Sequence, residues 1–128
     1  MEIVSTGFGG PDRLAARQTR NAAPQKGEVA VRIMAAAVNP FDRKLYADPD
    51  YTRSHGEAAP QFPLRLGVEA AGVVTAVGAA ANGPAGPILV GDHVIAYRIH
   101  GAYADRSSSR LRPSSRSRPN CRGRRPAR

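Results

Sequence analysis

The sequence predicts a mainly β domain, a small barrel or sandwich with short helices. Several short apolar or β-branched runs are separated by Gly- and Pro-rich turns, and helical periodicity is almost absent. Val29, Val31 and Ile33 recur at the period of two that is typical of a half-buried strand. With no Trp and only 5% aromatic residues, the core is expected to consist of Val, Ile, Leu and Ala.

The expected elements follow one another along the chain, bounded by turn residues. Short strands are expected over 1–6, 14–18, 28–34, 67–78 and 91–97, with the start of one more at 101–104. Pro40 suits the first turn of a short helix over about 40–46. The Pro-rich residues 48–64 are expected to form a long surface loop, and residues 79–87 an Ala/Gly/Pro loop.

Charge divides the chain into two segments. Residues 1–105 contain ten basic and ten acidic side chains, whereas residues 106–128 contain nine Arg and no acidic residue, which accounts for the whole formal charge of +9. The balanced segment argues against a nucleic-acid-binding domain. Residues 106–128 are rich in Arg, Ser and Pro and cannot bury a core, so we expect a domain over 1–105 followed by a disordered tail.

Targeting and redox signals are few. No apolar run approaches the ~20 residues that a membrane span requires, and the N-terminus lacks the cationic and apolar segments of a secretory signal. Cys121 is the only cysteine, which excludes an intrachain disulfide and a Cys-based zinc site in residues 1–105. These features predict a cytoplasmic protein that does not associate with a membrane.

Four segments, taken together and in order, resemble the medium-chain dehydrogenase/reductase superfamily. They are Phe8–Leu14, Gly27–Asp42, Gly67–Gly78 and Gly91–Val94, and they contain the motifs FGGPDRL, GEVAVR with AVNPFD, GVEAAGVV and GDHV. The closest similarity is to zinc-independent quinone oxidoreductases. The resemblance implies a GroES-like, partly open β-barrel with short helices, here incomplete at its C-terminal end. In that family the domain covers one side of a cleft, and a Rossmann domain that follows it binds NADPH.

The residues that match the zinc ligands of zinc-dependent relatives argue against a metal. Those relatives have a Cys three residues before the Asp that matches Asp42, and a His between a Gly and a Glu. This chain has Asn39 and Val68 at the two positions. Valine offers no lone pair, and a catalytic zinc needs about three N, S or O ligands from the protein. We therefore expect no metal site.

The resemblance places three side chains at or near the cleft. Asn39 would face the nicotinamide and the substrate, Asp42 would lie near the cofactor, and Tyr46 would donate a hydrogen bond to the substrate oxyanion. NADPH would supply hydride to a conjugated carbonyl or a quinone. The catalytic candidates are thus Asn39 and Tyr46, and the cofactor-binding candidates are Asn39 and Asp42.

Each candidate also has a structural interpretation. Asn39 before a proline suits a helix N-cap, and Asp42 in the first turn would offset the helix dipole. Tyr46 fits a half-buried packing residue. Gly67 and Gly72 indicate backbone geometry more than ligand contact. The three histidines form no spaced cluster and are expected at surfaces or turns.

The sequence contains no G-x-G-x-x-G phosphate loop. Gly7-Phe8-Gly9 begins such a loop, but Asp12 stands at the position of its last glycine. We therefore expect this truncated chain neither to bind NADPH by itself nor to turn over substrate.

The change in composition after Asp105 suggests a shifted reading frame. With permitted codons, the bases that encode Arg116 through Ala127 can be read as P-K-P-A-E-L-P-W-E-E-A, which is how the family pattern continues. The alternative is a genuine Arg/Ser-rich arm that binds phosphates without sequence preference.

Three function classes remain open. The first is the substrate-side domain of an NADPH-dependent, zinc-independent quinone or enal reductase, inactive as written. The second is a module that binds nucleic acid non-specifically through its Arg tail. The third is a non-catalytic GroES-like structural domain. Loss of the strand expected after Asp105 would expose a sheet edge, so homo-oligomer formation is open too.

Overall fold

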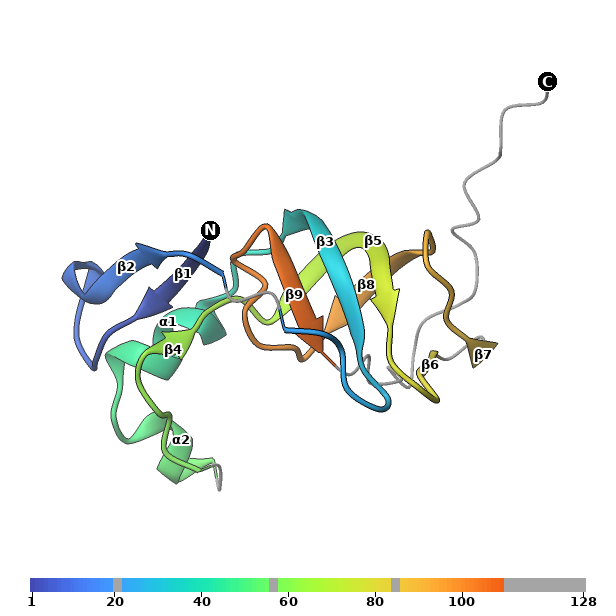
Figure 1. The fold of residues 1–128 in the computed structure, drawn as a ribbon. Helices are drawn as coiled ribbons and strands as arrows, with labels where there is room; N and C mark the ends of the chain where they lie inside the picture. The colour runs from blue at the N-terminus through green and yellow to red at the C-terminus, as the bar shows by residue number, and fades with distance from the viewer. Residues whose placement is uncertain (20–21, 56–57, 84–85, 110–128) are drawn as a thin grey trace.

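The computed structural model describes residues 1–19, 22–55, 58–83 and 86–109, which form two main antiparallel sheets (Figure 1). The larger sheet has the strand order β8-β5-β3-β9, and the smaller sheet the order β2-β1-β4. Both helices lie beside the smaller sheet, and the two-stranded β6-β7 ribbon lies at the far end of the larger one (Figure 1). The elements in chain order are β1 Glu2–Ser5, the 3-10 turn η1 Pro11–Arg13, β2 Leu14–Arg17, β3 Val29–Ala36, α1 Pro40–Ala47, α2 Tyr51–Ser54, β4 Leu64–Arg65, β5 Glu69–Val77, β6 Asn82–Gly83, β7 Gly86–Pro87, β8 His93–Tyr97 and β9 Arg106–Ser109.

The mainly β architecture is confirmed, and its sheets stay open rather than closing into a barrel. Two expected loops differ: residues 48–64 contain α2 and end at the first residue of β4, and residues 79–87 contain the two short strands β6 and β7. Tyr51 lies 4.3 Å from His55 and meets Phe41 edge-on at 5.8 Å, measured between ring centroids. These aromatic contacts support a helical turn that the Pro-rich composition conceals.

The expectation of a disordered tail after Asp105 is also corrected for the first four residues of that tail. Arg106–Ser109 form β9, which pairs antiparallel with β3, so the sheet continues past Asp105. Backbone hydrogen bonds make this pairing, and they do not depend on side-chain chemistry. Arg106 lies opposite Arg32, and Ser107 opposite Val31. The expectation for residues 110–128 lies outside the described residues.

The core of the larger sheet comes from alternating residues of its central strands. Val29 and Val31 of β3 are 1% and 4% exposed, and they pack with Val74 of β5. This confirms the inward face that the period of two predicts. Gly72 lets the strands approach closely, because a Cβ there would lie 2.2 Å from the carbonyl oxygen of Arg32. A glycine at this point therefore serves strand packing, as expected.

A buried carboxylate ties together the three strands of the smaller sheet. Glu2 of β1 is 3% exposed, and its two oxygens accept hydrogen bonds from Arg17 of β2 at 2.8 Å and Arg65 of β4 at 2.6 Å. Burial raises the pKa of the Glu2 carboxyl, but the hydrogen bonds and charges of the two arginines outweigh burial and hold this pKa below its usual 4.5. Ionised Glu2 therefore stabilises the fold.

We expect the Glu2→Gln substitution to lower the free energy of unfolding by about 1–2 kcal/mol at neutral pH, because it removes the charge from two hydrogen bonds. A depressed pKa adds stability above the unfolded-state pKa, and this stability is lost as the pH falls through the folded-state pKa. The two proteins should therefore converge in urea unfolding well below pH 4.5. Asp50→Asn, which removes the exposed pair with Arg53, is the control and should change little. A Glu2→Gln deficit that persists unchanged at low pH would contradict this assignment.

The Ser107→Val substitution is expected to raise the free energy of unfolding by about 1 kcal/mol through added apolar burial. Ser107 is 3% exposed and lies opposite the buried Val31, while its hydroxyl makes only a 3.3 Å hydrogen bond to the carbonyl oxygen of His100. Ser108→Val, one residue along on the opposite face of β9, is the matched control with a smaller expected gain. Thermal unfolding followed by circular dichroism measures both, and equal effects would argue against the inward orientation of Ser107.

Candidate functional site

The first turn of α1 begins with a capping box. The backbone N–H of Phe41 donates to Oδ1 of Asn39 at 3.0 Å, and the backbone N–H of Asn39 donates to Oδ2 of Asp42 at 3.0 Å. Pro40 occupies the first helical position. The N-cap interpretation of Asn39 is therefore confirmed. Because its Oδ1 is engaged, the Nδ2 amide group of Asn39 is the part of the side chain that can bind another molecule.

The carboxylate of Asp42 joins three distant segments. It is 4% exposed, and it accepts hydrogen bonds from the backbone N–H of Asn39, from the backbone N–H of Gly67 at 3.1 Å and from the hydroxyl of Tyr103 at 2.8 Å. Burial, together with the hydrogen bond and charge of Asp42, raises the pKa of Tyr103 to about 12. The start of α1, the entry to β5 and the segment before β9 are thus held together.

Gly67 is required at this junction for two reasons. Its φ is +89°, a conformation that other residues rarely adopt. A Cβ on Gly67 would also lie 2.6 Å from the backbone nitrogen of Tyr103 and 2.8 Å from Cβ of Ala102. Only a glycine can therefore present its N–H to Asp42 here, which confirms the backbone role expected for this residue.

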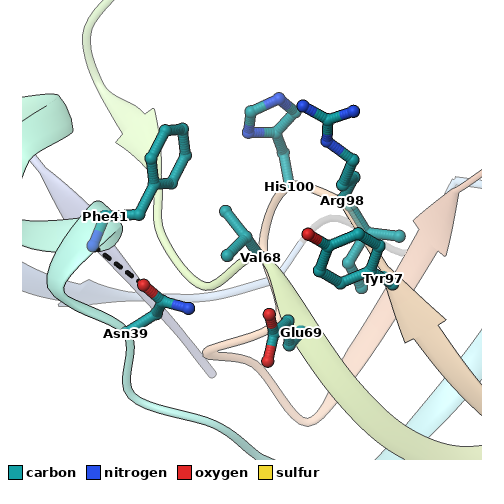
Figure 2. A pocket seen from close by; sticks show the side chains of 8 residues that line it. Asn39, Phe41, Val68, Glu69, Tyr97, Arg98 and His100 are labelled. Carbon is teal, nitrogen blue, oxygen red and sulfur yellow. Dashed lines mark hydrogen bonds between the residues drawn. The ribbon is translucent and has the colours of Figure 1, made fainter. Parts of the chain in front are cut away.

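An open cavity of about 510 Å³ lies beside this junction (Figure 2). Its lining comes from the start of α1, the start of β5 and the end of β8 with the residues that follow it. The lining residues are Asn39, Phe41, Val68, Glu69, Tyr97, Arg98, Ile99 and His100. Residues from three separate elements thus face one solvent-accessible space.

The structure brings only one of the three expected site residues to this cavity. Asn39 lines it, whereas Asp42 and Tyr46 do not. Tyr46 is 8% exposed and packs inside the domain, where its carbonyl oxygen accepts a hydrogen bond from the N–H of Gly9 at 2.9 Å. A helical spacing does not itself tell which face of α1 turns toward a cavity, and for this reason the sequence did not separate these positions.

The residues that follow β8 were not predicted from the sequence to belong to the site. Arg98 and His100 both line the cavity. His100 is exposed, which confirms its expected surface position, but its place beside a cavity was not predicted. The position of both residues directly after the expected strand 91–97 was the available signal, because side chains at strand ends often line binding sites. Arg98 has a φ of +55°, in the left-handed region that is strained for a residue other than glycine.

The lining of the cavity bears on the expected absence of zinc. Val68, at the position that matches a zinc-binding His, lines the cavity with an aliphatic side chain and is 8% exposed. Within the described ranges, no group of three or more His, Cys, Asp or Glu could hold a metal ion. The absence of zinc nonetheless stays a prediction. Across the same ranges, no helix has the length and apolar character needed to cross a bilayer.

Comparisons with known proteins find the GroES-like domain that the sequence resemblance implies. The family described as the alcohol dehydrogenase GroES-like domain matches residues 25–118. The chain is 29% identical over 103 residues to the synaptic vesicle membrane protein VAT-1 homolog-like of Mus musculus, which covers 80% of this chain and 22% of that protein.

Two solved quinone oxidoreductases are similar in structure. The enzyme of Escherichia coli complexed with NADPH has a TM-score of 0.68 and 31% identity, covering 85% of this chain and 30% of that chain. The enzyme of Pseudomonas syringae pv. Tomato DC3000 has a TM-score of 0.66 and 33% identity, covering 84% of this chain and 30% of that chain. The chain thus spans less than a third of the length of each of these relatives.

We expect Tyr103→Phe to lower the free energy of unfolding by about 1–3 kcal/mol, because the buried Asp42 carboxylate loses one donor. The raised pKa of Tyr103 means that this hydrogen bond contributes fully below pH 10 and is lost as the pH rises toward 12. Urea unfolding at neutral pH measures the loss. Tyr97→Phe, at an exposed tyrosine, is the control. If the two variants were equally stable, the hydrogen bond from Tyr103 to Asp42 would not stabilise this junction.

Proposed function

Because the chain belongs to the alcohol dehydrogenase GroES-like domain family, within the medium-chain dehydrogenase/reductase superfamily, we propose that it is the substrate-side part of an oxidoreductase. The proposed reaction is the NADPH-dependent, zinc-independent reduction of a conjugated carbonyl or a quinone in the cytoplasm. The observation that carries this proposal is the cavity whose rim holds the Nδ2 amide of Asn39 beside the first turn of α1. The similarity to quinone oxidoreductases supports the choice of substrate class.

Asn39 is the proposed catalytic residue of this chain. Its Nδ2 group donates a hydrogen bond to the carbonyl oxygen, on which negative charge grows as hydride adds to the conjugated system. The capping box fixes the backbone of Asn39, and Oδ1 is held by the N–H of Phe41, so the donor is oriented before substrate arrives. The aliphatic Val68 and the ring of Phe41 supply apolar walls beside the reacting atoms.

The residues of this chain fit one end of NADPH. NADPH supplies the hydride when bound. The cavity offers the amide of Asn39 and apolar contacts that suit a flat nicotinamide ring. The pyrophosphate normally needs a Gly-rich loop at a helix N-terminus, and this sequence contains no such motif. In our proposal the pyrophosphate is bound by another domain, and the 128-residue chain alone does not oxidise NADPH in the presence of a quinone.

Asp42 and Tyr46 have different proposed parts. Asp42 acts as a positioning residue, since its buried carboxylate holds the backbone of Asn39 and reaches the cofactor only through it. A hydrogen bond from Tyr46 to the substrate oxyanion stays a prediction. A fall in kcat without a change in KM on Tyr46→Phe, in a full-length enzyme that carries this domain, would support it.

Substitution of Asn39 by Ser tests the proposal on this chain directly. The serine hydroxyl still caps α1, so the free energy of unfolding should change by less than about 0.5 kcal/mol. The amide donor is lost, and the affinity for a neutral conjugated ketone, benzylideneacetone, should fall about fivefold. Titration of the 128-residue chain, followed by backbone amide chemical shifts, measures both the site and the affinity.

Asn82→Ser is the matched control, because Asn82 is exposed on β6 and does not line the cavity. It should leave the ketone affinity unchanged. If the Asn39 and Asn82 variants bind the ketone equally, or if the shifts fall outside the cavity, the proposed function is wrong.

We also infer that residues 106–128 derive from a shifted reading frame. The switch from balanced charge to nine Arg without an acidic residue supports this, as does the family continuation P-K-P in another frame. Resequencing of the coding DNA across the codons for Asp105 and Arg106 tests it. If the frame is correct, the nine arginines favour a second function, salt-dependent binding to nucleic-acid phosphates.

A further inference from the structure

The cavity has two ends of different chemistry. Figure 2 shows Arg98 and His100 at one end of the view and Asn39 and Glu69 at the other, with the aliphatic side chain of Val68 between them. A molecule that spans the cavity therefore meets cationic and imidazole groups at one end and an amide donor with a carboxylate at the other.

Arg98 has two features that point to a ligand. Across the described ranges, every ion pair involves another basic group, so the Arg98 guanidinium has no acidic partner there. Its φ of +55° costs a residue with a side chain about 1–2 kcal/mol, which a glycine would avoid. An arginine kept in a strained conformation at a cavity rim, without an ion-pair partner, suggests a binding role.

The end of the cavity that holds Arg98 and His100 suits an anionic group. A guanidinium is always charged and presents parallel N–H donors that match a carboxylate or a phosphate. His100 adds an imidazole group that can donate a further hydrogen bond. Glu69 lines the cavity at the Asn39 end, where it disfavours a fully charged carboxylate or phosphate more than the neutral carbonyl oxygen of a bound ketone.

We propose that the cavity selects conjugated carbonyl compounds that carry an anionic group, a carboxylate or a phosphate, at the end remote from the carbonyl. Arg98 and His100 bind the anionic group while Asn39 binds the carbonyl oxygen. The repulsion from Glu69 sets the orientation, so the reacting carbonyl lies beside α1. This inference rests on the proposed function, because it takes the Asn39 end as the site of the carbonyl.

The test compares benzylideneacetone with its para-carboxylate in titrations of the 128-residue chain, followed by backbone amide chemical shifts. The wild-type chain should bind the carboxylate about fivefold more tightly than the neutral ketone. Arg98→Gln should abolish this preference and leave the affinity for the neutral ketone unchanged. Arg43→Gln removes the same charge from an exposed position on α1 outside the cavity, and it should keep the preference.

A second variant separates binding from folding. Arg98→Gly accepts the positive φ without strain, so it should unfold at a higher urea concentration than the wild type while it loses the carboxylate preference. Loss of the preference in this more stable variant cannot come from a damaged fold.

The outcomes distinguish this inference from the proposed function. Equal affinities for the two ketones in the wild type, or a preference retained in Arg98→Gln, would overturn the inference and leave the proposed function intact if Asn39→Ser still weakens ketone binding. Carboxylate binding that needs Arg98 but not Asn39 would keep the anion site and reject the carbonyl site. A parallel titration with nicotinamide mononucleotide and nicotinamide riboside covers the other source of an anion. If Arg98→Gln weakens only the nucleotide, the anion belongs to the cofactor and the substrate assignment is wrong.

Discussion

The buried carboxylate of Asp42 is the constraint on which the cavity depends. A charge that is 4% exposed would be costly without partners, and three donors from three separate segments satisfy it. Two of these donors are backbone N–H groups, so the carboxylate fixes the course of the main chain at Asn39 and at Gly67. The hydroxyl of Tyr103 adds the third segment. The distance between α1 and the beginning of β5 follows from this arrangement.

The cavity is a consequence of that distance. Asn39 and Phe41 form one rim because α1 begins there, while Val68 and Glu69 form another wall because β5 begins two residues after Gly67. β8 pairs with β5 and ends at Tyr97, so the residues after Tyr97 return toward the same space. A residue deep in the domain thus controls where the exposed polar groups lie, without facing the cavity itself.

The edge strand β9 of the larger sheet shows that strand pairing through backbone hydrogen bonds does not require apolar side chains. β9 pairs with β3 although its sequence is Arg-Ser-Ser-Ser and places Arg106 opposite Arg32. The main-chain hydrogen bonds supply the pairing, although the residues of β9 are polar or charged where apolar ones would stabilise more. Composition therefore predicted a boundary at Asp105, whereas the larger sheet continues past this residue.

Local patterns determined most of the elements from the sequence alone. The alternation of Val29, Val31 and Ile33 predicts β3 with its inward face, and Asn39-Pro40 predicts the capped start of α1, because such signals act within a few residues. The site was decided by contacts between residues far apart in the chain. Asp42 meets Gly67 and Tyr103, 25 and 61 residues further on, and Arg98 reaches the cavity only because β8 pairs with β5. Only tertiary packing brings such groups together, and so the sequence identified Asn39 but could not tell that Tyr46 turns inward.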